Sequence, residues 1–275
     1  MQDLLGLLGG LLMRLIGLLG SSYCGSTMLG CIFGGLPGVE YIGESHWIID
    51  GPNKCRCWMQ DVPPAECHLN AALMGLRLDQ VNWWERLSDV LGASVLVSGD
   101  KHPKHFDRFG LPDVAVTIRR DVRGWCVSYC HLKKMKREDR DLVLAEVNPT
   151  EEELTEAAEL YRSTYQHIDS WRAERCIPGI GVDLDQFLEL PEVELYQICS
   201  ALGLPFDADA LHFEAKIHHH IGGNAQVGMR KITGHRPRYH EERRRLRGGF
   251  PKPDTAWQQV LTEQQATMVQ EIAWS

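Results

Sequence analysis

The sequence has no net positive charge and lacks a long, uninterrupted apolar segment. Its 275 residues include 29 lysines and arginines against 37 aspartates and glutamates, and the net charge of −8 disfavours a general nucleic-acid-binding function. The longest apolar run, Leu4 to Leu19, spans only about 16 residues, and it contains four glycines and Arg14 but no cleavage site. We therefore do not expect a membrane segment or a signal peptide. We expect residues 1–12 to form an N-terminal extension and residues 13–275 to form a single domain.

The nine cysteines lack the regular spacing of a disulfide framework, and Cys126, Cys130 and Cys199 fall within apolar helical patterns. Such cysteines are typical of a core in a reducing compartment, so we expect a cytoplasmic location. A separate cluster in a proline-rich segment is an alternative site for structural zinc, although its spacings are not those of a standard zinc finger. Free thiols are the simpler interpretation, and we assign no metal to the functional site. This cluster consists of Cys55, Cys57 and Cys67, with His46 and His68 nearby.

Short apolar runs alternate with amphipathic helical patterns along the chain. With 44% hydrophobic residues, the chain is able to bury a full core in one large domain. Strands that alternate with helices are typical of a parallel sheet with helices on both faces, so we predict a three-layer α/β/α fold. The predicted helices include residues 78–91 and 191–202, and a capping box at Thr150 and Glu153 begins another. The predicted strands are residues 13–19, 38–44, 94–97, 113–118 and 179–182.

The first predicted strand runs into a turn, Gly20 to Thr27, which leads into an apolar helical pattern. Two glycines separated by four residues and followed by a hydroxyl residue have the spacing of a phosphate loop, in which backbone N–H groups and a helix N-terminus converge on an anion. A nucleoside triphosphatase needs a lysine where this chain has Ser26, so cleavage of ATP or GTP is disfavoured. The predicted phosphate-binding residues are Ser22, Tyr23, Cys24, Gly25, Ser26 and Thr27.

Polar residues follow the other predicted strands, at the edge of the sheet where open α/β proteins bind their ligands. Glu44 ends the second strand, Lys101 and His102 follow the third, and Arg120 follows the fourth, with Ser128 two turns into the next helix. Together they describe a cleft with two anion sites and one carboxylate, which suits a 3′-phosphorylated nucleotide better than a linear triphosphate. A later glycine-rich stretch adds the candidates Asn224, Arg230 and Lys231.

At these positions the chain resembles the sulfotransferase family, whose donor is 3′-phosphoadenosine 5′-phosphosulfate (PAPS). The similarity covers about Met13 to Trp257. It implies that the phosphate loop binds the 5′-phosphosulfate end of the donor, that Arg120 and Ser128 bind the 3′-phosphate, and that Glu44 is the general base. The motif Asp100-Lys101-His102-Pro103 is similar to one that supplies a catalytic lysine or histidine. Further matches, to bacterial members especially, are Val182-Asp183-Leu184, Pro191, Ala201-Leu202-Gly203-Leu204 and His220-Ile221-Gly222-Gly223-Asn224.

The chain departs from the family pattern in its phosphate loop, where Tyr23 replaces the usual lysine or arginine. Lys101 is therefore expected to stabilise the leaving group alone. Sulfuryl transfer in line requires positioning, charge stabilisation and a base for the acceptor. The resemblance implies a PAPS-dependent sulfotransferase that acts on a hydroxyl or amine of a small-molecule acceptor and requires no metal for the chemistry. The expected catalytic residues are Glu44, Lys101 and His102.

Three other functions stay open on the sequence alone. A P-loop kinase is disfavoured by Ser26 and by the lack of an apolar strand that ends in a magnesium-binding aspartate. A catalytically weak or inactive nucleotide-binding protein of the same fold is favoured by Tyr23. An RNA-binding module would use the basic run Arg243 to Arg245, but Glu241 and Glu242 adjoin that run. We expect neither a nucleic-acid nor a membrane partner, and a homo-oligomer stays an open alternative.

Overall fold

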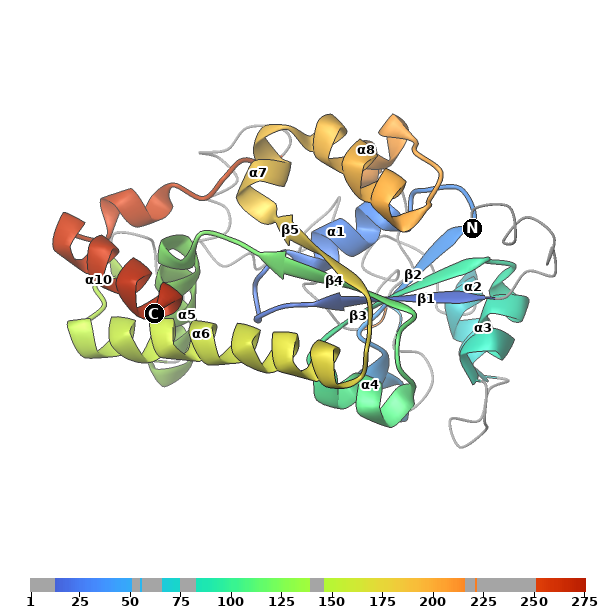
Figure 1. Cartoon of the computed structure of the whole chain (residues 1–275), viewed down its shortest axis with the longest axis horizontal. Coiled ribbons are helices and arrows are strands. Elements are labelled where there is room, and N and C mark those ends of the chain that lie inside the picture. The colour runs from blue at the N-terminus through green and yellow to red at the C-terminus, as the bar shows by residue number, and fades with distance from the viewer. Residues whose placement is uncertain are drawn as a thin grey trace.

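A parallel sheet forms the centre of the protein, with helices on both of its faces (Figure 1). The computed structural model describes residues 13–50, 55, 66–74, 83–138, 146–215, 221 and 251–275. Within these ranges the sheet has five strands in the order β2-β3-β1-β4-β5, and all neighbouring strands are parallel. The strands are β1 (Arg14–Leu19), β2 (Val39–Gly43), β3 (Val95–Lys101), β4 (Val114–Arg119) and β5 (Gly179–Asp183).

Four short elements cover one face of the sheet. Alternate strand residues point to this face, as Ile16 and Leu18 of β1 and Val116 and Ile118 of β4 do, and all four side chains are fully buried. Because the intervening residues are buried against the other helical layer, β1 and β4 read in the sequence as continuous apolar runs. The four elements are α1 (Ser26–Phe33), α7 (Leu184–Glu189), α8 (Pro191–Leu202) and the 3₁₀ segment η5 (Ala208–Ala215).

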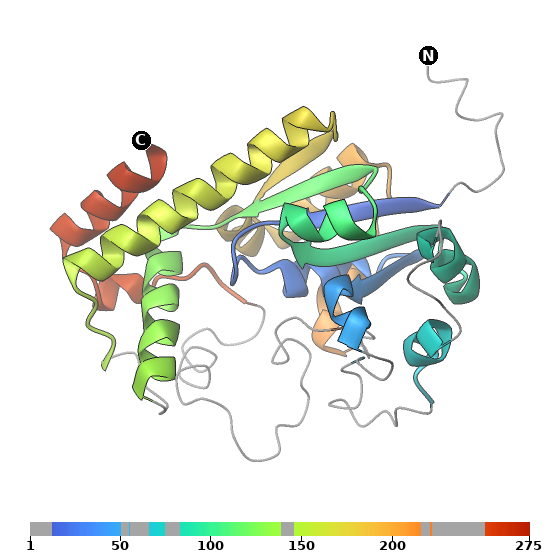
Figure 2. The same ribbon diagram turned by 90° about the horizontal axis from the view of Figure 1, so that it is seen from below.

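The opposite face packs against a second layer, whose long helix α6 (Glu151–Glu174) lies below the sheet in Figure 1, with α7 and α8 above the sheet. In both Figure 1 and Figure 2, the last helix lies beside the long helix α6. The predicted capping box is confirmed, because Thr150 and Glu153 exchange hydrogen bonds at the start of α6. This layer contains α4 (Pro103–Phe109), α5 (Val122–Glu138), α6 (Glu151–Glu174), η6 (Ala256–Gln259) and α10 (Glu263–Trp274).

A third apolar cluster lies around α2 (His68–Met74) and α3 (Trp83–Leu91), at the end of the molecule away from α10 (Figures 1 and 2). The indole N–H groups of Trp83 and Trp84 both donate to the carbonyl oxygen of Phe109, at 2.9 and 2.6 Å. These bonds join α3 to the end of α4, and so support the helix that follows β3.

The five strands and their parallel arrangement confirm the predicted fold class. The predicted third strand was too short, because β3 continues to Lys101 through the buried residues Ser98 and Asp100. The structure describes only residues 83–91 of the helix predicted at 78–91, and the predicted extension at 1–12 lies outside the described residues. Within the described residues, every helix is too short or too polar to cross a membrane.

Candidate functional site

The phosphate loop turns sharply from β1 into α1 at the carboxyl edge of the sheet. Gly25 has a φ of 92°, and a Cβ atom there would lie 2.7 Å from Leu184, so this position requires glycine. Tyr23 also has a positive φ, of 66°, which is uncommon for a residue with a bulky side chain. Because α1 begins at Ser26 without a side-chain cap, its first N–H groups point out of the helix end, where an anion can bind.

Three side chains hold this loop in place. The Tyr165 hydroxyl accepts a hydrogen bond from the backbone N–H of Ser21 at 3.4 Å and donates one to the carbonyl of Ile118 at 2.6 Å. The indole of Trp125 donates to the carbonyl of Ser22 at 2.6 Å. The guanidinium of Arg120 donates to the carbonyl of Tyr23 at 3.1 Å. The loop is therefore anchored to the second helical layer and to the end of β4, which preorganises it for a ligand.

Glu44 and Lys101 form an ion pair beside the loop. Glu44 directly follows β2, Lys101 ends β3, and the two strands are neighbours in the sheet. The backbone N–H of Gly20 donates to the carbonyl of Lys101 at 3.1 Å, which joins the pair to the start of the phosphate loop. Lys101 has a φ of 61°, so this strand end is strained in the way that functional sites often are.

The Glu44 side chain is 10% exposed and that of Lys101 is 17% exposed, so both are largely buried at this edge of the sheet. Burial alone would raise the pKa of Glu44, but the Lys101 ammonium and the indole N–H of Trp47, 3.0 Å away, outweigh burial and lower that pKa. Glu44 is therefore ionised near neutral pH, as a base must be. Lys101 provides a positive charge within reach of the phosphate loop.

Asp100, the residue before Lys101, is a buried carboxylate that accepts hydrogen bonds from several donors. It is 1% exposed, and it accepts hydrogen bonds from the hydroxyl groups of Ser45 and Ser98. It also accepts bonds from the backbone N–H of His46 at 3.0 Å and from its ring Nδ1 at 2.7 Å. Burial opposes ionisation, but the hydrogen bonds from His46, Ser45 and Ser98 outweigh it and lower the pKa of Asp100.

Two further histidines lie at the start of α4. His102 follows Lys101 and precedes Pro103, and burial together with the Lys101 charge lowers its pKa, so it stays neutral near pH 7. His105 stacks on the ring of His46, with centroids 3.9 Å apart and planes 15° apart. Burial lowers the pKa of His105 to about 4.

A metal ion is a poor fit to this group. Donor atoms of His46, Asp100 and His105 all lie within 4.8 Å of one another. However, the lone pairs of two stacked imidazoles lie in nearly parallel planes and cannot converge on one ion, because a metal lies close to the plane of each ring that binds it. We therefore interpret the group as a hydrogen-bonded cluster.

Arg120 lies at the end of β4 in a second charged cluster. Its Nη2 atom donates to Asp254 at 2.6 Å, and the two side chains are only 8% and 5% exposed. Asp185 of α7 accepts from the backbone N–H groups of Asp121 at 2.5 Å and Asp254 at 3.4 Å, and so holds the Asp254 segment in place. Among the described residues, the buried Nε atom of Arg120 has no hydrogen-bond partner. One donor of the guanidinium is therefore still available.

Ser128 lies one helical turn after Gly124 in α5, and the Arg120 guanidinium packs against Gly124. The Ser128 hydroxyl donates to the carbonyl of Gly124 at 2.8 Å. A Cβ atom on Gly124 would lie 3.0 Å from Nη2 of Arg120 and 3.3 Å from Asp254, so the absence of a side chain there leaves room for the guanidinium. Arg120, a predicted ligand of the 3′-phosphate, already binds an internal anion.

Several predicted residues cannot be placed. Asn224, Arg230 and Lys231 lie outside the described residues, as does Cys57 of the cysteine and histidine cluster. The two histidines of that cluster bind other groups, because His46 bonds to Asp100 and His68 lies 3.0 Å from Glu40. Cys55 and Cys67 are buried thiols. The described residues therefore give the zinc alternative no assembled ligand set.

Sequence reasoning missed two contributors to the site. Asp100 was part of a motif but received no role, although a buried aspartate directly after the apolar run of a strand is a usable signal. Asp254 had no local signal, since it lies 134 residues from Arg120 in the sequence.

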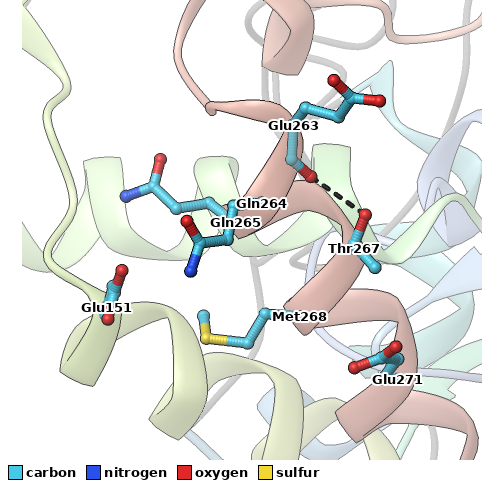
Figure 3. A pocket seen from close by; sticks show the side chains of 7 residues that line it. All are labelled: Glu151, Glu263, Gln264, Gln265, Thr267, Met268 and Glu271. Carbon is cyan, nitrogen blue, oxygen red and sulfur yellow. Dashed lines mark hydrogen bonds between the residues drawn. The ribbon is translucent and has the colours of Figure 1, made fainter.

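A separate cavity of about 550 Å³ lies between the start of α6 and the outer side of α10 (Figure 3). In Figure 3 the Thr267 hydroxyl donates to the backbone carbonyl of Glu263, at 3.0 Å, within α10. None of the strand-end residues lines this cavity, so we do not assign it to the site. Its lining residues are Glu151, Glu263, Gln264, Gln265, Thr267, Met268 and Glu271.

Comparisons with known proteins identify the fold. No family model and no curated protein matches the sequence. Among solved structures, the chain is similar to the sulfotransferase domain from the curacin biosynthetic pathway, with a TM-score of 0.55 and 13% identity over 94% of this chain and 97% of that one. It is also similar to the sulfotransferase domain of the Synechococcus PCC 7002 olefin synthase, with a TM-score of 0.51 and 14% identity over 95% and 94% of the two chains. The protein therefore has the sulfotransferase fold.

Proposed function

We propose that the protein is a sulfotransferase that transfers the sulfuryl group of PAPS to a hydroxyl or amine of a small-molecule acceptor. The observation that carries this proposal is the Glu44–Lys101 ion pair, which lies beside the phosphate loop at the carboxyl edge of a sulfotransferase fold. This arrangement combines an anion site, a cation and a base in one place. Those are the components that transfer of a sulfuryl group requires.

In the proposed complex, the phosphate loop from Ser22 to Thr27 binds the 5′-phosphosulfate end of PAPS through its backbone N–H groups. Arg120 and Ser128 bind the 3′-phosphate, and Asn224, Arg230 and Lys231 are further candidate ligands. For Arg120 to do so, its bond to Asp254 must be exchanged or shared, since that carboxylate now occupies one of its donors. The Nε atom, which is buried and has no hydrogen-bond partner among the described residues, is one more donor for that phosphate once the pair rearranges.

The chemical step follows from the positions of Glu44 and Lys101. As the acceptor atom attacks sulfur, an O–S or N–S bond forms and the bond from sulfur to the bridging phosphate oxygen breaks. Lys101 stabilises the negative charge that develops on that oxygen, and Glu44 takes the proton of the acceptor. The leaving product is adenosine 3′,5′-bisphosphate. His102, next to Lys101, remains a candidate for a second contact with the leaving group.

A second candidate function is nucleotide binding without catalysis. The observations that favour it are the exposed Tyr23, which replaces a cation in the loop, and the Asp254 carboxylate on Arg120. Such a protein would bind adenosine 3′,5′-bisphosphate and fail to turn over PAPS. Turnover of PAPS therefore distinguishes these two functions. A kinase would differ from both because it would prefer ATP with magnesium.

Two measurements test the proposal. In calorimetry, adenosine 3′,5′-bisphosphate should bind at least about tenfold more tightly than AMP, because a charge-assisted contact to the extra phosphate is worth about 1.5 to 3 kcal/mol. In a turnover assay, PAPS with a panel of a phenol, a primary alcohol and a primary amine should release adenosine 3′,5′-bisphosphate. Equal affinity for the two nucleotides, or a preference for ATP with magnesium, would overturn the proposed donor. Binding without release would favour the non-catalytic alternative.

A further inference from the structure

The ring of His46 is held on several sides next to the Glu44–Lys101 pair. Its Nδ1 atom lies 2.7 Å from a carboxylate oxygen of Asp100, and its backbone N–H donates to the same oxygen at 3.0 Å. One face of the ring stacks on His105 at 3.9 Å, and the ring of Trp47 lies 5.2 Å away. A surface histidine without a role does not need this degree of fixation.

The bond to Asp100 determines which ring nitrogen carries the proton. Because Asp100 is ionised and accepts from Nδ1, the neutral imidazole has its hydrogen on Nδ1 and a lone pair on Nε2. That Nε2 atom faces Glu44, at 4.0 Å from the second carboxylate oxygen. The two acceptor atoms lie about 1 Å too far apart to share a proton in this arrangement, so the transfer requires them to approach when substrate binds.

Glu44 by itself is poorly suited to keep a proton. One of its oxygens bonds to Lys101 and the other accepts from Trp47, and both contacts favour the ionised form. A carboxylate in this state is able to take the acceptor's proton only briefly, during the attack on sulfur. An imidazole is in general the more basic group, and Asp100 stabilises its protonated form.

We propose that His46 relays the acceptor's proton away from Glu44, with Asp100 as its positioning residue. The proton moves from the acceptor to Glu44 as the bond to sulfur forms, and then from Glu44 to Nε2 of His46. The resulting imidazolium is stabilised by Asp100, and it returns the proton to solvent through its exposed edge, since the side chain is 22% exposed. The relay rests on the proposed function and deepens it, because it acts through the proposed base.

The surroundings of His46 agree with this role. The groups that face it are Glu44 after β2, Asp100 of β3, and His102 and His105 from the start of α4. Lys101 is bound to Glu44. Near neutral pH His102 and His105 are uncharged, so two carboxylates and no neighbouring imidazolium act on the His46 ring.

A pair of substitutions separates the relay from a structural role. His46→Asn keeps an N–H donor close to the position of Nδ1, and so preserves the bond to Asp100, but it removes Nε2. His46→Gln places an amide near Nε2 and gives up the bond to Asp100. The relay predicts that His46→Asn lowers kcat by about 10²-fold. The affinity for adenosine 3′,5′-bisphosphate and the Tm should stay unchanged. His167→Asn, on the exposed side of α6, is the matched control and should leave kcat, this affinity and the Tm unchanged.

The pH profile provides a readout that a structural role would not move. In the wild type, kcat should fall on the acid side of its pH profile, and in His46→Asn this acid limb should disappear or move to lower pH, because the Nε2 acceptor is gone. If His46→Asn keeps wild-type kcat and an unchanged profile, while His46→Gln is unstable, the histidine is structural and the relay is wrong.

A second measurement distinguishes failure of the relay from failure of the proposed function. Nitrogen NMR of histidine-labelled wild-type protein, with His46 assigned by its absence in His46→Asn, should show the tautomer protonated on Nδ1. The Nε2 tautomer would overturn the relay even if PAPS is turned over. Conversely, failure of wild-type protein to bind adenosine 3′,5′-bisphosphate and to turn over PAPS would overturn the proposed function, and the relay with it.

Discussion

The ends of β3 and β4 both place a basic side chain next to the phosphate loop, yet the two are neutralised in different ways. Lys101 pairs with Glu44 from the neighbouring strand, and these side chains keep 17% and 10% of their surface exposed. Arg120 pairs with Asp254 from a distant segment, and those side chains keep only 8% and 5%. Both pairs are largely buried, but the first keeps somewhat more of its surface exposed, because Lys101 is the most exposed of the four side chains.

The difference indicates a division of labour between the two strand ends. Lysine is a compact point charge on a flexible stem, which suits it to follow charge that develops during a reaction. The guanidinium of Arg120 instead joins the carbonyl of Tyr23 to Asp254, and so connects the phosphate loop to the C-terminal segment. We therefore expect the β3 end to determine turnover, and the β4 end to determine donor affinity and stability.

The largest expected effect is that of Glu44→Gln on turnover. The amide keeps the size and hydrogen-bonding capacity of the carboxylate but loses its basicity, so kcat should fall by roughly 10² to 10⁴ while donor affinity changes little. Glu156→Gln is the matched control, because Glu156 forms an exposed ion pair with Lys133 at 2.7 Å, and it should leave kcat unchanged. Near-full turnover by Glu44→Gln would show that another group is the base.

Arg120→Ala should mainly reduce stability and donor binding. Removing one partner of a buried ion pair leaves the other charge unpaired, which typically costs about 3 to 5 kcal/mol. Urea denaturation should show this loss in the free energy of unfolding. The double variant Arg120→Ala with Asp254→Ala should be less destabilised than Arg120→Ala alone, because no isolated carboxylate remains. If the double variant is the less stable of the two, Asp254 has a stabilising role apart from this pair.

Asp254→Asn tests whether the internal carboxylate competes with the 3′-phosphate for Arg120. The amide keeps a hydrogen-bond acceptor but removes the negative charge, so adenosine 3′,5′-bisphosphate should bind about tenfold more tightly, equivalent to about 1.4 kcal/mol. AMP, which lacks the 3′-phosphate, should bind as it does to the wild type and is the control ligand. Calorimetry that finds the bisphosphate affinity unchanged or weaker would place the 3′-phosphate away from Arg120.

The sequence predicted the layers of the fold because parallel strands buried on both faces are continuous apolar runs, as in β1 and β4. It also predicted that Glu44, Lys101 and Arg120 share one edge of the sheet, since the carboxyl ends of parallel strands meet there. The order of the strands did not follow from these local patterns, because it depends on which long crossovers bury the most apolar surface.

The charged partners of the site were harder to predict than its position. Asp254 lies 134 residues from Arg120, and no local pattern connects the two. The donors to Asp100 come from two chain segments, Ser45 with His46 after β2 and Ser98 on β3, and only the folded sheet brings them together. Their pairing could not be read from spacing, because a hydrogen bond between side chains depends on geometry of less than 1 Å.

The last expected effect concerns the acid stability that Asp100 confers. Its pKa in the folded protein lies below the ordinary value of 3.8, because hydrogen bonds from His46 and the two serines outweigh the effect of burial. The folded state therefore binds fewer protons than the unfolded state as the pH falls through this range. The contribution to stability is fully present above the ordinary pKa and is lost as the pH falls through the lowered one. Asp100→Asn should reduce the free energy of unfolding at neutral pH by about 1 to 3 kcal/mol.

Below pH 4, Asp100→Asn should also show a shallower loss of stability than the wild type, because this carboxylate no longer titrates. The free energy of unfolding, measured in urea between about pH 2.5 and 7, checks both expectations. Asp89→Asn, on the exposed side of α3, is the control, and its free energy of unfolding should depend on pH as that of the wild type does. Glu44 also has a lowered pKa, so part of the acid dependence should persist in Asp100→Asn. An unchanged slope would mean that Asp100 is not ionised in the folded protein, and the fixed tautomer of His46 would then lose its physical basis.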